Sequence, residues 1–201
     1  MYLLLRKCEP NVRKIARANR KDVEQAGVSV VGDLFAWGTA YVLHLIQAEG
    51  FLSPDLSFHP RPKKHDLIEK YGTIQVAGEI LKPDIDLLIY SNKPGTPLVF
   101  VNMKTSLRER AGQTHRWKMV LDIALHCKQL KEKYELKYQG ERPIKFAFAT
   151  TNFYDELNKP QQRANIRFFD FVYLARDDRP IPSSVSRFSQ LPEDLRSLFP
   201  L

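Results

Sequence analysis

The sequence predicts an α/β protein in which a mixed β-sheet is flanked by helices and preceded by a helical N-terminal part. Two observations indicate this class. Helical patterns occupy the first 50 residues, and a pair of β-rich runs is then followed by alternating helix and strand patterns. A chain of 201 residues is most simply one domain. Residues 1–50 would form its helical part and residues 75–175 its α/β core.

The first expected helix covers about residues 11–26 and is basic. Arg13, Arg17 and Arg20 recur at three- or four-residue spacing, so they share one face of this helix. Lys21 belongs to the same group. This face would contact DNA phosphates, or it would be an ordinary solvated surface.

The second expected helix runs from about Val30 to Glu49 and is apolar on nearly every side. Gly50 follows it, as glycine commonly does where a helix ends. Such a helix is buried in the core, or in the core and a subunit interface. Its most apolar stretch, Leu34–Leu43, is too short to span a bilayer.

The middle of the chain predicts a β-hairpin. Ile85–Tyr90 and Leu98–Lys104 are rich in β-branched and aromatic residues, and the segment between them is dense in turn formers. If the turn is centred on Pro94–Gly95, residues whose numbers sum to about 188 or 189 lie opposite each other.

Polar residues converge at one end of this hairpin. Asn102 and Lys104 share a face of their strand because side chains two residues apart point the same way, and so do Asp84 and Asp86. The register places Asp84 near Lys104 and Asp86 near Asn102. Two carboxylates beside an ammonium group are suited to Mg²⁺, with the lysine positioning or deprotonating the attacking water. The alternative is a cross-strand ion pair at a sheet edge.

The second half of the chain predicts alternating helices and strands. Its expected elements are a long amphipathic helix at about Arg110–Tyr134, a strand at Ile144–Thr150, a short helix near Tyr154–Gln162, a strand at Arg167–Ala175 and, after a loop from Pro180, a last helical turn near Pro192–Phe199.

Composition indicates a polyanionic partner. Lys and Arg number 31 against 23 Asp and Glu, a net charge of +8, and nucleic acid is the commonest partner of such a domain. The proline-rich basic loop His59–His65 would also be able to touch DNA. Cys8 and Cys127 form no CxxC pair, which favours a reducing cytoplasm over a disulfide framework or a zinc site. The chain contains neither a P-loop nor GxGxxG, so no nucleotide cofactor is expected.

Pro83-Asp84, followed twenty residues later by Lys104 in a β-strand, resembles the PD-(D/E)xK nuclease signature. The run KTSLRER from Lys104 to Arg110, with Gln113 one helical turn later, resembles small type II restriction endonucleases that cut short GC-rich palindromes. The resemblance covers about Lys82–Asp122. It implies a restriction-endonuclease-like core, Mg²⁺, double-stranded DNA as substrate, and a homodimer with two symmetric active sites.

The resemblance also implies roles for single residues. Asp84 would be a metal ligand, the main-chain carbonyl of Met103 another ligand, and Lys104 the catalytic lysine. Just after that lysine, the family reads C·G pairs with an Arg-acid-Arg run. The matching residues are Arg108, Glu109 and Arg110. Gln113, His115 and Arg116, which follow them, are further candidate DNA contacts. The arginines would otherwise be a phosphate clamp or a salt-bridged helix start, and His115 would otherwise be plain surface.

One position departs from the family pattern. The family has an acid two residues before the lysine or about thirteen after it, and these positions are Asn102 and Trp117 here. Asparagine lends a metal an oxygen without a charge, so weaker metal binding is expected. Asp86 is the nearest replacement by hairpin geometry, with Glu79 and Asp33 behind it. An engineered inactivating change at Asn102 would explain the gap equally well.

Three functions follow from these patterns. The first is a Mg²⁺-dependent type II restriction endonuclease acting on a short palindrome. The second is a structure-specific nuclease such as a junction resolvase, against which the base-reading arginines count. The third is a DNA-binding protein on an inactivated nuclease fold, for which Asn102 is the argument.

Overall fold

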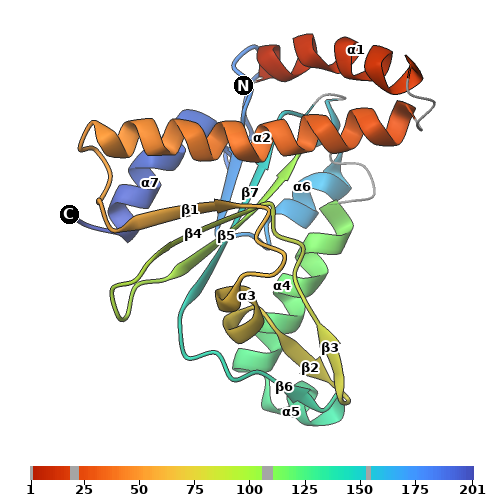
Figure 1. The fold of residues 1–201 in the computed structure, drawn as a ribbon. Helices are drawn as coiled ribbons and strands as arrows, with labels where there is room; N and C mark the ends of the chain where they lie inside the picture. The colour runs from red at the N-terminus through yellow and green to blue at the C-terminus, as the bar shows by residue number, and fades with distance from the viewer. Residues whose placement is uncertain (1, 19–22, 106–110, 153–154) are drawn as a thin grey trace.

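A six-stranded mixed sheet forms the centre of the protein in the computed structural model, which describes residues 2–18, 23–105, 111–152 and 155–201 (Figure 1). The strand order is β1-β4-β5-β7-β8-β9. β4 (Leu87–Ser91) runs antiparallel to both of its neighbours, β1 (Leu56–Pro60) and β5 (Leu98–Lys104). The other three continue parallel to β5: β7 (Ile144–Thr150), β8 (Phe171–Leu174) and β9 (Ser186–Arg187). The mixed sheet flanked by helices is therefore confirmed.

Helices cover both faces of this sheet. One face carries α1 (Tyr2–Ala18), α2 (Val23–Ala48) and α7 (Leu191–Leu198), and the other carries α3 (Asp66–Tyr71), α4 (Ala111–His126) and α6 (Pro160–Ile166). Strand alternation divides the core accordingly. Val99 and Val101 of β5 pack in the cluster with α2, whereas Leu98 and Phe100 pack in the cluster with α4.

A second, small sheet extends from the α4 side of the protein (Figure 1). Its order is β3 (Glu79–Leu81), β2 (Ile74–Val76) and β6 (Leu136–Lys137), and α5 (Lys128–Lys133) precedes β6. The sequence patterns did not predict this sheet, because strands of two or three residues are too short for a clear alternation. The strands β1 and β9 were not predicted either, so the central sheet takes in residues on both sides of the span 75–175.

Three helix predictions were wrong in their bounds, and one of them is the helix expected from Val30 to Glu49, which is α2 and begins at Val23. The basic helix expected at 11–26 is α1, which begins at Tyr2 and ends at Ala18, while α2 begins at Val23. Leu5 explains the early start, because it is buried in the core cluster that also contains residues of α2. The long helix expected at 110–134 is divided into α4 and α5 at Cys127, whose backbone is extended at φ −122° and ψ 92°.

The predicted hairpin strand at 98–104 and the strand at 144–150 match β5 and β7 in full. The strand expected at 167–175 is shorter, because Arg167 and Phe169 still donate backbone hydrogen bonds to the last turn of α6. The helix expected near 154–162 is a 3-10 turn, η1 (Glu156–Asn158), followed by α6. A second 3-10 turn, η2 (Phe188–Gln190), leads into α7, which confirms the predicted last helix. Over the residues that the structure describes, no helix is both long and apolar enough to cross a membrane.

Candidate active site

The β4–β5 hairpin has the register that the turn residues predict. Leu87 faces Val101 and Ile89 faces Val99, so opposite residues sum to 188. Asp86 continues this ladder beyond β4, because its main-chain N–H donates to the carbonyl of Val101 over 3.0 Å. The predicted polar residues therefore meet at the open end of the hairpin.

Lys104 joins the two predicted carboxylates. Its Nζ lies 3.0 Å from Oδ2 of Asp84 and 3.0 Å from Oδ2 of Asp86. The two acids differ in their surroundings. The Asp84 side chain is 56% exposed, whereas the Asp86 side chain is 2% exposed and that of Lys104 13%. This end of the hairpin is therefore open to solvent on the Asp84 side and closed on the Asp86 side.

Asp86 is held by three donors. Besides Lys104, the main-chain N–H of Met103 donates to Oδ2 over 2.8 Å, and the guanidinium of Arg61 donates to Oδ1. A buried carboxylate is costly unless its charge is balanced and its oxygens accept hydrogen bonds. Both conditions are met here, because Lys104 and Arg61 balance the charge of Asp86 and both of its oxygens accept hydrogen bonds.

Arg61 was not predicted as part of the site. It follows β1 directly in a left-handed backbone conformation at φ 55°, and its main-chain N–H donates to the carbonyl of Asp86 over 2.9 Å. On its other side, its Nε donates to Oδ1 of Asp33 over 2.6 Å. The only sequence signal was the basic loop that contains it, because the pairing of β1 with β4 was not foreseen.

Asn102 is fully buried and partly unsatisfied. Its Nδ2 donates to the main-chain carbonyl of Asp84 over 2.5 Å. A carbonyl only accepts, so this contact fixes the orientation of the amide. Its Oδ1 has no hydrogen-bond partner among the residues that the structure describes. A buried acceptor left in this way costs about 1–3 kcal/mol.

The oxygens at this end of the hairpin fit a Mg²⁺ ion, which prefers hard oxygen ligands. They are the carboxylates of Asp84 and Asp86, the amide oxygen of Asn102 and the carbonyl of Met103. The observation that favours a cation or a water here is the Oδ1 of Asn102, which is buried without a hydrogen-bond partner among the described residues. Within the described ranges no three His, Cys, Asp or Glu side chains gather into a metal site. A metal here would therefore need the neutral oxygens as well as the two acids.

The alternative acids are placed differently. Asp33 reaches the site only through Arg61, and Glu79 lies on β3 of the small sheet. At the family's alternative acid position, Trp117 is buried against Phe100 and Phe146, with ring centroids 6.3 and 5.1 Å away. Of the acids considered as replacements, the structure thus brings Asp86 into contact with Lys104, whereas Glu79 lies on the small sheet.

Several predicted DNA contacts cannot be placed. Arg20, Arg108, Glu109 and Arg110 lie outside the described residues, and of Gln113 only its position in α4 is described. His115 stacks on Phe168 with ring centroids 5.4 Å apart, and Arg116 is exposed on α4. Arg13 and Arg17 lie on α1, which packs against α2 on the other face of the sheet from α4 (Figure 1).

A cleft of about 290 Å³ opens beside Asp84. Its lining residues are Pro62, Lys63, Ile68, Lys82, Pro83, Asp84 and Ile85. Lys82 is paired with Glu69 at 2.7 Å, whereas Lys63 is exposed and makes no ion pair with a described residue.

His65 lies at the end of the loop His59–His65. Burial lowers the pKa of His65, nearby His59 lowers it further, and Asp66 raises it. The neutral ring can then accept from the N–H of Leu67 at the start of α3.

The comparisons with known proteins bear on this geometry. The sequence profile of the family described as BsaWI restriction endonuclease type 2 matches residues 64–197, which is two thirds of the chain. The chain belongs to this family. No curated protein matches the chain. The part matched to the BsaWI family contains Asp84, Lys104 and the run up to Arg110, while Arg61 and the helices α1 and α2 lie before it. Type 2 restriction endonucleases are site-specific nucleases, so the substrate of the family is DNA.

Proposed function

We propose that this protein hydrolyses phosphodiester bonds at a short, specific sequence of double-stranded DNA, with Mg²⁺ bound at the open end of the β4–β5 hairpin. One observation carries the proposal. In a member of a restriction endonuclease family, the ammonium group of Lys104 lies 3.0 Å from both Asp84 and Asp86 at the end of a buried strand.

Each residue of the hairpin end has a role in this proposal. Asp84 and Asp86, with the carbonyl of Met103, would hold Mg²⁺, which supplies Lewis-acid stabilisation of the negative charge on the phosphate. Lys104 orients the attacking water and offsets phosphate charge. Arg61 balances the negative charge of the buried Asp86. Asn102 takes the place of the acid in the PD-(D/E)xK pattern and contributes a neutral oxygen.

The specificity of the proposed enzyme comes from the segment after Lys104. Arg108 and Arg110 would donate to guanine O6 and N7 in the major groove, and Glu109 would orient them or accept from cytosine N4. The target is accordingly a palindrome containing G·C pairs. The net charge of +8 favours approach to DNA of any sequence.

The test is incubation with plasmid or phage DNA in the presence of Mg²⁺, with EDTA as the control. Discrete bands that require Mg²⁺ are the expected result. A smear would contradict sequence specificity, and cleavage of a four-way junction but not of linear DNA would identify a junction resolvase. DNA binding without cleavage would identify an inactivated nuclease fold, which is the function that Asn102 favours.

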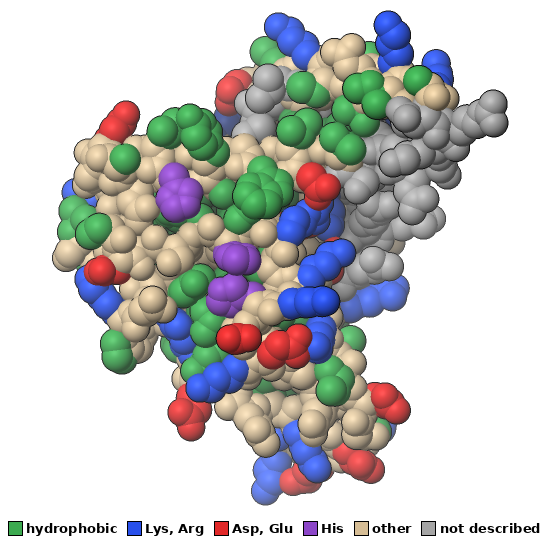
Figure 2. All heavy atoms as spheres, in the orientation of Figure 1, with side chains coloured by type: hydrophobic (Ala, Val, Ile, Leu, Met, Phe, Trp, Pro, Cys, Tyr) green, Lys and Arg blue, Asp and Glu red, His purple; other side chains and the backbone are tan. Residues whose placement is uncertain are grey.

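A homodimer is the second part of the proposal, since two symmetric active sites cut both strands of a palindrome. The outer face of α2 supports it. Hydrophobic side chains gather along this helix (Figure 2). Those at three- or four-residue spacing on one exposed face are Val30, Leu34, Trp37, Tyr41 and Leu45. Monomers rarely expose a contiguous apolar patch of more than a few hundred Å².

The size of this α2 face suits a second copy of the chain. Trp37 and Tyr41 are 59% and 65% exposed. At roughly 150–250 Å² for each aromatic side chain, these two alone expose on the order of 200–300 Å². A stable interface buries about 800 Å² on each partner, around a central aromatic cluster. The remaining apolar residues of the face and their polar neighbours would supply the rest.

Trp37→Glu is expected to convert the dimer to a monomer. Loss of a central tryptophan costs about 2 kcal/mol or more, which is on the order of thirtyfold in the dissociation constant. Sedimentation velocity measures the change, and plasmid cleavage should shift from double-strand breaks to nicks. The control is Tyr134→Glu, which places the same charge at an exposed aromatic residue following α5. A wild-type monomer, or a variant that stays dimeric, would refute α2 as the interface.

Lys63→Gln is expected to weaken DNA binding and to reduce the salt dependence of log K by about one unit of slope, because one phosphate contact in the cleft beside Asp84 is lost. Fluorescence anisotropy at several salt concentrations measures both quantities. The control is Lys93→Gln, which removes an equal charge from the hairpin turn, where Lys93 pairs with Asp55 at 2.7 Å. Equal effects of the two substitutions would rule out a specific phosphate contact in the cleft.

A further inference from the structure

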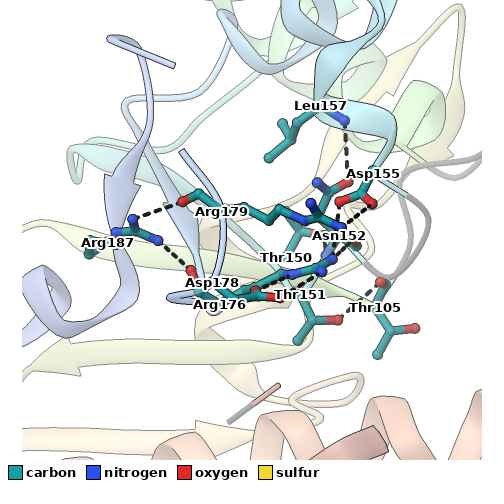
Figure 3. Close-up of polar contacts among 10 residues, drawn as sticks. All are labelled: Thr105, Thr150, Thr151, Asn152, Asp155, Leu157, Arg176, Asp178, Arg179 and Arg187. Carbon is teal, nitrogen blue, oxygen red and sulfur yellow. Dashed lines mark hydrogen bonds and ion pairs between the residues drawn. The ribbon is translucent and has the colours of Figure 1, made fainter. Parts of the chain in front are cut away.

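Three parallel strands end together at the edge of the sheet that carries Lys104. Lys104 of β5 faces Thr150 of β7, and Thr150 faces Leu174 of β8. Thr105 and Thr151 come next in register. There the contact between β5 and β7 is made by a side chain, because Oγ1 of Thr151 donates to the main-chain carbonyl of Thr105 over 3.0 Å (Figure 3).

Thr151 is fully buried and is itself held in place. The next residue, Asn152, has a left-handed backbone at φ 49°. Its N–H donates to Oγ1 of Thr150 over 2.9 Å, and its Oδ1 accepts from the N–H of Leu157 over 3.2 Å. Thr150 and Leu157 thus hold Asn152, the residue that follows Thr151, from two sides.

A buried arginine, Arg176, contacts Asn152 and Asp155 from the β8 side. Nη1 of Arg176 donates to the carbonyl of Asn152 over 3.0 Å and lies 3.2 Å from Asp155, and its Nε donates to Asp178 over 2.6 Å (Figure 3). The guanidinium of Arg187 donates in turn to the carbonyl of Arg176. Burying an arginine costs free energy even when it is paired, so such a network is weak evidence for stability and better evidence for a fixed geometry.

The hydroxyl of Thr151 is the point at which this network reaches the candidate active site. Valine has nearly the same shape as threonine and would fill the same space in the core. Only the hydroxyl can donate a hydrogen bond to the main-chain carbonyl of Thr105, the residue that follows Lys104. Fixing that carbonyl restricts the backbone torsions at the end of β5, and with them the position from which the lysine side chain extends.

We propose that Thr151 is a positioning residue for Lys104, and that the network around Arg176 holds Thr151 in place. The inference rests on the proposed nuclease function. Misplacement of a catalytic group by about 1 Å can lower a rate by on the order of a hundredfold, whereas substrate binding depends on other contacts. Thr151 therefore acts on the rate of the chemical step and not on affinity for DNA.

The test compares three variants of the full chain: Thr151→Val, Thr151→Ser and Thr39→Val. Thr39 is the control because it is also buried and its hydroxyl also donates to a main-chain carbonyl, that of Phe35 in α2, over 2.8 Å. The rate is measured with the wild-type cleavage site under saturating Mg²⁺, together with KM and the melting temperature.

Thr151→Val should lower kcat by about tenfold to a hundredfold and leave KM unchanged. Thr151→Ser should have most of the wild-type kcat, because serine retains the hydroxyl. Thr39→Val should have the wild-type kcat. An undiminished rate in Thr151→Val overturns the inference alone. So does a serine variant no better than valine, or an equal loss in Thr39→Val, because either result reduces Thr151 to a structural residue. A wild-type protein that cuts no DNA overturns the proposed function, and the inference with it.

Discussion

Replacing Lys104 with alanine is expected to lower the rate of DNA cleavage by at least about a hundredfold to a thousandfold without unfolding the protein. Among the described residues, Lys104 is the cation that contacts both Asp84 and Asp86, so its loss removes both the positioning of water and a charge opposite the phosphate. The fold should persist, because Asp86 keeps its bonds to Arg61 and to the N–H of Met103. Cleavage of cognate DNA measures the rate, and circular dichroism checks the fold.

The chain offers a matched control for this experiment in Lys118. Its side chain is also 13% exposed, and its Nζ donates to both oxygens of Asp122 over 2.7 and 2.6 Å on α4. Lys118→Ala therefore removes an equally shielded, doubly bonded lysine outside the hairpin, and its cleavage rate should stay near that of the wild type. If Lys104→Ala cuts DNA as fast as the wild type, the hairpin is not the active site.

Replacing Asn102 with aspartate is expected to have two opposite effects. Without metal, the new carboxylate would face the carbonyl of Asp84, which now accepts from Nδ2 over 2.5 Å. Losing that bond in a buried position costs roughly 2 kcal/mol, or about 4–8 °C in Tm. With Mg²⁺, the third acid should lower the metal concentration that cleavage requires, because a charged oxygen then lies beside the two existing acids.

The measurement for Asn102→Asp is a Mg²⁺ titration, followed both by cleavage rate and by Tm. Mg²⁺ should raise the Tm of the variant more than that of the wild type, because binding to the folded state stabilises it by mass action. Asn158→Asp is the control, since it adds the same charge at an exposed position in η1. Coincident titration curves for Asn102→Asp and the wild type would place the metal elsewhere. Slower cleavage by the variant at every Mg²⁺ concentration would instead mean that Asn102 is adapted to its place beside Asp86.

The sequence by itself determined the hairpin and the residues that meet at its end. Turn formers lie between two β-rich runs, and a strand period of two residues leaves no freedom about which side chains share a face. For that reason Asp84, Asp86 and Lys104 could be brought together from their numbers alone. These are local relations, settled within about twenty residues of chain.

The tertiary structure alone decided how the charges of the site are balanced. Arg61 reaches Asp86 because β1 pairs with β4, and Thr151 reaches Thr105 because β7 lies beside β5. Neither pairing has a signal in the local pattern, because contacts across 25 or 46 residues depend on how the whole chain packs. The tertiary structure also decided that the Oδ1 of Asn102 is unsatisfied. Whether this atom is buried, and whether a described donor reaches it, depends on how the sheet packs and not on the residue type.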